Sequence, residues 1–135
     1  MKLRVSLLAR EAKSNVDGTF DIIGGGVTEF KVAGGYLLGA PMKLDFAAVI
    51  RVEMDDKELD TLRSAELTVM FEGQRIGWPQ RLPLAMRRVE GEKRYYVNLI
   101  TELHVLVPKT GEGYIQVVLD EGRVSAPHMH FRVSF

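Results

Sequence analysis

Two histidines near the end of the chain are the residues best suited to metal chemistry. His128 and His130 stand two positions apart in "APHMHF", and on a β-strand such residues point to one face, about 7 Å apart along the chain. Imidazole binds zinc and iron, but a site needs at least a third ligand. Arg132 shares this face and would repel a cation, and His104 is expected in the other sheet. The pattern favours a solvated polar face or an interface, with metal binding as the alternative.

A run of acidic residues, "EMDDKELD" at 53–60, is the second candidate for ion binding. An EF-hand calcium loop needs carboxylates at alternate positions, then a glycine and a distal glutamate. Asp55 and Asp56 are adjacent and no glycine follows them. We therefore expect a solvated loop or the start of a helix, which favours acidic residues. A loose calcium site at a sandwich edge stays open.

Between Gly73 and Tyr96, aromatic residues are interspersed among basic ones, a pattern that can bind single-stranded nucleic acid. Tyr95, however, falls on the apolar face of its segment, and the whole chain has no net charge. Because tryptophan, tyrosine and arginine dominate protein interfaces, we predict a protein-binding surface instead. Its partner is another protein or a second copy, whose acidic run could meet this basic stretch. The candidate interface residues are Trp78, Arg75, Arg81 and Tyr96.

Catalysis finds little support. The chain has no cysteine, and none of its serines lies in the Gly-x-Ser-x-Gly motif of hydrolases. Its three histidines and scattered acidic residues form no recognisable triad. The sequence predicts a protein that is not an enzyme, with no catalytic residue and no cofactor.

The glycines Gly24, Gly25 and Gly26 in "DIIGGGVTEF" resemble a ligand loop. A dinucleotide-binding loop needs a third glycine where Glu29 stands, followed by a helix. The residues that follow, "VTEFKV", alternate like a strand instead. We predict that the glycines bend a strand or carry it from one sheet to the other.

The composition is that of one soluble domain. The chain has 135 residues, of which 46% are hydrophobic and 27% charged, and its 18 basic residues balance 18 acidic ones. This neutrality gives no field that would steer the protein to nucleic acid or to an anionic membrane. No stretch approaches the roughly 20 apolar residues of a membrane span, and no signal peptide is evident. We expect a cytoplasmic protein.

Alternation of apolar and polar residues is the strongest structural signal. It occurs at 43–53, 65–72, 95–107, 114–120 and 128–135, and two shorter segments, "LRVSLLA" and "GTFDII", bring the total to seven or eight strands. Glycine turns separate the strands, and Gly122 in "DEGR" is expected in the left-handed conformation of a hairpin. Only residues 56–66 could form a short helix. We predict one all-β domain over residues 1–135, an immunoglobulin-like antiparallel β-sandwich.

The segments "LLAREAKSNVDGTFDIIGGGVTEF", "GEGYIQVVLDEG" and "FRVSF" resemble the two ends of a family of short bacterial and phage proteins of unknown function. The resemblance implies an immunoglobulin-like sandwich and no known activity. It leaves open a structural or accessory role in a phage. In such domains a tyrosine near the start of the penultimate strand bonds back to the backbone, the tyrosine corner. Tyr114 is the candidate, and an ordinary half-buried aromatic residue is the alternative.

Overall fold

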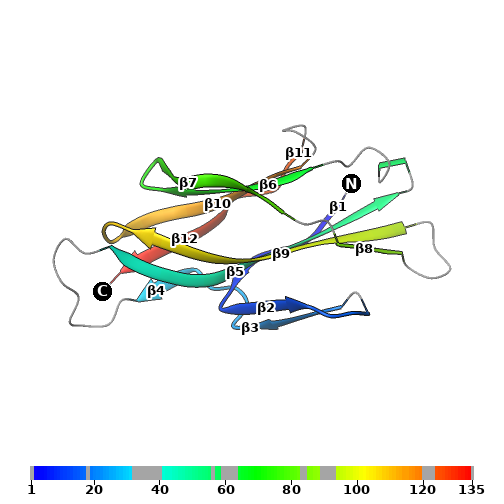
Figure 1. The fold of residues 1–135 in the computed structure, drawn as a ribbon, viewed down its shortest axis with the longest axis horizontal. Helices are drawn as coiled ribbons and strands as arrows, with labels where there is room; N and C mark the ends of the chain where they lie inside the picture. Colours follow the sequence, from blue (N-terminus) through cyan, green and yellow to red (C-terminus); the bar gives the residue numbers. More distant parts are fainter. Residues whose placement is uncertain are drawn as a thin grey trace.

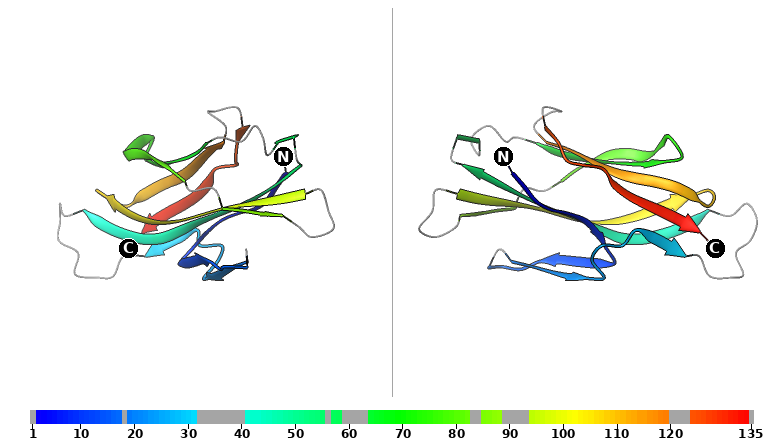
Figure 2. Two further views of the ribbon diagram at one scale, coloured as in Figure 1. Left: turned by 45° about the vertical axis from the view of Figure 1, so that its right-hand side comes forward. Right: turned by 180° about the vertical axis from the view of Figure 1, so that it is seen from behind.

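The computed structural model describes residues 2–17, 19–31, 41–55, 57–58, 64–82, 85–88, 94–119 and 124–134. These residues contain twelve strands, which form two packed sheets and one separate hairpin. Figures 1 and 2 show the two sheets as layers, with the hairpin on the far side of the first sheet. The protein is all-β, as the alternation predicts. Within the described residues, no helix has the length and apolar character needed to cross a membrane.

The first sheet has the order β1-β5-β9-β8, and all its neighbours are antiparallel. The long strands β5 (Met42–Asp55) and β9 (Arg94–Val107) pair over their full length. At the two edges of this sheet lie β1 (Lys2–Ala9) and β8 (Ala85–Arg88).

The second sheet has the order β4-β12-β10-β6-β7. Strand β4 (Glu29–Lys31) pairs in parallel with β12 (Met129–Ser134), and the other pairs are antiparallel. Strands β10 (Gly111–Leu119), β6 (Ala65–Phe71) and β7 (Gln74–Arg81) complete the sheet, while the short β11 (Val124–Ser125) pairs with the end of β10.

This strand order is that of an immunoglobulin-like sandwich. Such domains place strands A, B, E and D in one sheet and C, F and G in the other, to which variable domains add C′. Here β1, β5, β9 and β8 take the positions A, B, E and D, and β12, β10, β6 and β7 take G, F, C and C′. The structure has more strands than expected because the first strand is divided into β1 and β4, with a hairpin inserted between them, and because β11 is added.

The glycine segment lies where the first strand changes sheets. The inserted hairpin consists of β2 (Glu11–Ser14) and β3 (Phe20–Ile23), and β4 of the second sheet follows the glycines. Gly24 and Gly26 have φ angles of 63° and 82°, in the region that favours glycine. The Gly26 N–H donates a hydrogen bond of 2.8 Å to the Leu8 carbonyl at the end of β1. A strand, not a helix, follows this turn.

The main core lies between the two sheets. The apolar side of each alternating segment faces inward, so that Ile50, Leu99 and Ile115 are almost fully buried. Four phenylalanine rings from both sheets contact one another in a chain: Phe30, Phe46, Phe71 and Phe131.

A smaller core lies on the other side of the first sheet, beneath the hairpin. Ala12 of β2 packs there against Ala47 and Val49 of β5, which are fully buried. Partly buried apolar side chains surround them: Val5, Leu7, Phe20, Ile22 and Ile100. The middle of β5 is thus buried on both faces, and this explains the uninterrupted apolar run "FAAVI".

Of the short helix expected at 56–66, Lys57 and Glu58 are helical, but Ala65 and Glu66 are wrongly included, because they begin strand β6. The Glu58 N–H donates a hydrogen bond of 2.8 Å to the Asp55 carboxylate, the arrangement of a helix N-cap. Gly122 and the other residues of the "DEGR" turn lie outside the described residues.

Candidate functional site

The outer face of the second sheet carries a row of four side chains from four adjacent strands. Met70 of β6 is paired with Arg75 of β7 on one side and with Tyr114 of β10 on the other, and Tyr114 is paired with His130 of β12. Their neighbours along each strand point into the core, so these four point away from it. With strands about 4.8 Å apart, the row spans about 14 Å. We call these four residues, together with Trp78 and His128, the aromatic row.

The β7 end of the aromatic row is the most exposed. Trp78, the only tryptophan of the chain, has 84% of its surface exposed. The Arg75 guanidinium lies 5.6 Å from the centre of the Trp78 ring, within cation–π range. Among the described residues, Arg75 has no carboxylate partner. This end therefore presents an unpaired cation and a large aromatic ring to the solvent.

Aromatic and imidazole rings gather at the other end. The Tyr114 and His128 rings stack in parallel with their centres 4.2 Å apart, and the His130 ring centre lies 5.7 Å from Tyr114. Within the described part of the chain, the Tyr114 hydroxyl has no hydrogen-bond partner. The structure therefore places Tyr114 as a half-buried, stacked ring on the outer face rather than in a tyrosine corner.

The two histidines share one face, as their spacing indicates, and their ring centres are 6.1 Å apart. Arg132 follows on the same face, where its guanidinium lies 3.6 Å from the Glu112 carboxylate. Across the described ranges, no three His, Cys, Asp or Glu side chains lie close enough together to hold one metal ion. The described residues thus supply at most half of a four-ligand site here.

The four predicted interface residues do not form one surface. Arg81 lies on β7 opposite Glu66, on the same face as Trp78 and Arg75. Tyr96 belongs to β9 and lies on the outer face of the first sheet, on the other side of the sandwich. Among the described residues, the basic and aromatic stretch is therefore divided between two faces.

The outer face of the first sheet holds a polar network that the sequence alone does not reveal. Glu53 is buried and accepts hydrogen bonds from Arg4 on β1 and from Arg94 on β9, the latter at 2.8 Å. Both bonds lower the pKa of the Glu53 carboxyl, and the bond from Arg4 has the larger effect. Glu53 begins the acidic run, so this carboxylate is used within the fold and is not presented to a second copy.

Arg51 of β5 contacts the inserted hairpin on the same outer face. Its guanidinium lies 4.5 Å from the Phe20 ring centre and 5.0 Å from that of Tyr96, between two aromatic rings. Its Nε donates a hydrogen bond of 2.7 Å to the Asn98 side chain. Tyr96 is half-buried and packs against Arg51 within the fold.

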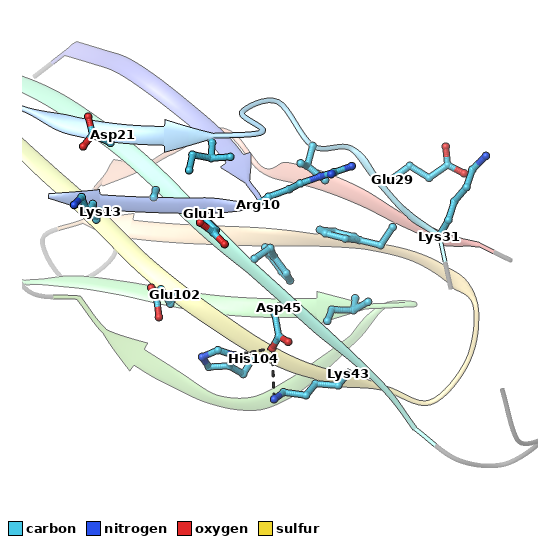
Figure 3. A pocket seen from close by; sticks show the side chains of 16 residues that line it. Arg10, Glu11, Lys13, Asp21, Glu29, Lys31, Lys43, Asp45, Glu102 and His104 are labelled. Carbon is cyan, nitrogen blue, oxygen red and sulfur yellow. Dashed lines mark hydrogen bonds and ion pairs between the residues drawn. The ribbon is translucent and has the colours of Figure 1, made fainter. Parts of the chain in front are cut away.

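An open groove of about 1460 Å³ lies between the hairpin, β4 and the first sheet. Figure 3 shows charged side chains of both signs mixed around it: Arg10, Lys13, Lys31 and Lys43, and Glu11, Asp21, Glu29, Asp45 and Glu102. On its floor the Asp45 carboxylate lies 2.7 Å from His104 Nδ1 and 3.7 Å from Lys43 Nζ. The hydrogen bond with His104 is the main cause of a lowered Asp45 pKa. The groove combines opposite charges and favours no single ligand charge.

Comparison of the chain with protein-family models, with curated proteins and with solved structures found no match in any of the three. We therefore infer function from the geometry of the aromatic row.

Proposed function

We propose that this chain is a non-catalytic protein-binding module that associates with a second copy of itself through the aromatic row. The observation that carries the proposal is the register of four strands, which collects Arg75, Met70, Tyr114 and His130 in one line on a solvent-exposed face. Trp78 is exposed beside this line.

The composition of the row supports a protein interface. Tryptophan, tyrosine and arginine are the side chains that contribute most when interfaces are truncated to alanine, and methionine is enriched there. A ring such as Trp78 exposes much apolar surface to water in the free protein, which costs about 25 cal/mol of free energy per Å². Covering it with a partner recovers this free energy.

The edge of the same sheet is less suited to binding than its face. Strand β7 is an edge strand among the described residues. Gly77 has a φ of 70°, the register with β6 is interrupted nearby, and Pro79 offers no N–H. Bulges and prolines on edge strands prevent pairing with another chain. This favours contact through side chains of the face rather than addition of a strand.

Net charge does not oppose self-association, because the chain has 18 basic and 18 acidic residues and no net charge at neutral pH. Proteins near zero net charge have little long-range repulsion between copies. A single row of this size fits a weak interface, with a dissociation constant in the micromolar range.

Sedimentation equilibrium with EDTA present tests the proposal. We expect wild-type protein to form dimers over about 1–300 μM, and Trp78→Ala to remain monomeric. Leu106→Ala is the matched control, because Leu106 is also exposed, at 56%, but lies on the first sheet. A wild type that stays monomeric throughout, or a Trp78→Ala variant that dimerises equally well, contradicts the proposal.

Trp78 also supplies an optical test, since the chain has no other tryptophan. Acrylamide should quench its fluorescence less effectively as the protein concentration rises through the dimerisation range. Leu106→Ala should show the same change. An accessibility that does not depend on concentration would place the contact elsewhere.

A further inference from the structure

We infer that His128 and His130 form half of a zinc site, which a second copy completes. The inference rests on the proposed function in that it uses the same face and the same partner. It adds a ligand, a divalent transition metal, that strengthens the association.

The histidine geometry is close to what zinc requires. Two imidazoles on one tetrahedral zinc, with Zn–N bonds of about 2.0–2.1 Å, have ring centres about 5 Å apart. The His128 and His130 rings are 6.1 Å apart, tilted by 59°, and both residues are exposed. A small rotation of either side chain closes the difference. Stacking on Tyr114 restricts the motion of His128 and so lowers the entropic cost of binding.

The rest of the coordination shell is missing from a single chain. Zinc takes four ligands in structural sites, and the described residues offer no third His, Cys, Asp or Glu beside this pair. A second pair of histidines would complete a four-histidine site. The nearest cation, Arg132, is directed toward Glu112, which offsets part of its charge.

Two-fold symmetry supplies the second pair. An axis that is parallel to the aromatic row and crosses the chain between His128 and His130 turns each strand of the face onto its own copy, so that the histidine pair meets the pair of the second copy. The same axis brings the two Arg75 side chains together, and their repulsion weakens a metal-free dimer. Zinc bound at the histidine end would offset that repulsion.

The experiment uses the full chain without a histidine tag, and zinc sulfate as the probe. Calorimetry should give one zinc for every two chains. Sedimentation should show that zinc lowers the dissociation constant of the dimer about tenfold or more. His128→Ala and His130→Ala should each lose that gain. His104→Ala is the control and should retain it, because His104 lies on the first sheet beside Asp45.

The outcomes separate the two proposals. One zinc per chain without a change in mass, no zinc binding at 100 μM, or equal binding by wild type and the His128→Ala and His130→Ala variants overturns the zinc site. His130→Gln, which keeps a polar side chain on this exposed strand, replaces His130→Ala if the alanine variant unfolds. Association of the wild type in EDTA tests the proposed function alone, whatever zinc does.

Discussion

At the scale of single residues, Glu53 shows how far alternation can be trusted. The pattern puts Glu53 on the polar side of β5 and predicts a solvated carboxylate. The side chain does lie on that side, but it is buried beneath two arginines. One of them, Arg4, is 49 residues away in sequence. No local signal identifies such a partner, because it depends on which strand becomes the neighbour of β5.

Glu53 should make the protein sensitive to acid. Its pKa is lowered in the folded state from an ordinary value of 4.5, so the unfolded chain binds the proton more tightly. The stabilisation is therefore complete above the ordinary pKa and is lost as pH falls through the lower, folded value. Glu53→Gln should show a shallower loss of stability between about pH 5 and pH 2, measured by urea denaturation.

Asp45 provides a matched comparison, since its pKa is also lowered but its partner His104 lies on an exposed surface. Exposed ion pairs contribute little. Asp45→Asn should therefore alter the acid limb less than Glu53→Gln does. Equal effects of the two substitutions would contradict the importance of the Arg4 and Arg94 bonds.

At the scale of elements, the strands with long alternation could be predicted, as could β3 within "GTFDII", whereas β2, the other strand of the inserted hairpin, could not. Segments 65–72 and 114–120 closely match β6 and β10. Strand β2 has four residues with one apolar side chain, Ala12, and gives almost no periodic signal. Its position is determined by the surface that it covers on β5, which is a tertiary effect.

Two adjacent isoleucines of β3 test the packing of the hairpin. Ile22 packs into the small core against the first sheet, whereas Ile23 is 61% exposed. Ile22→Ala should lower the free energy of unfolding by about 1–2 kcal/mol, because the side chain is only partly buried. Ile23→Ala should change it by no more than about 0.5 kcal/mol. Urea denaturation measures both, and equal losses would mean that the hairpin does not pack as described.

At the scale of the whole molecule, sequence predicts two sheets but not which strands are neighbours. Trp78, Arg75 and the histidine pair each stand out in the sequence for a different reason. Their union in one row depends on the order β12-β10-β6-β7, which pairs residues far apart in sequence, such as Met70 and Tyr114, 44 positions apart. Tyr96 belongs to β9 of the other sheet and lies on the opposite side of the sandwich. Long-range pairing of this kind leaves no local trace in the sequence.

The separation of the two faces leads to a double dissociation between stability and association. Tyr96→Ala removes a ring from Arg51 and should destabilise the fold by about 1–3 kcal/mol without weakening the dimer. Trp78→Ala should weaken the dimer without destabilising the fold, since the exposed ring belongs to neither core cluster of the described residues. Because the two sites share no partner, the stability effects in the double variant should add within about 0.5 kcal/mol.

Thermal unfolding of dilute protein and sedimentation of concentrated protein measure the two properties. A Tyr96→Ala variant that loses the dimer while it keeps its stability would place the interface on the first sheet.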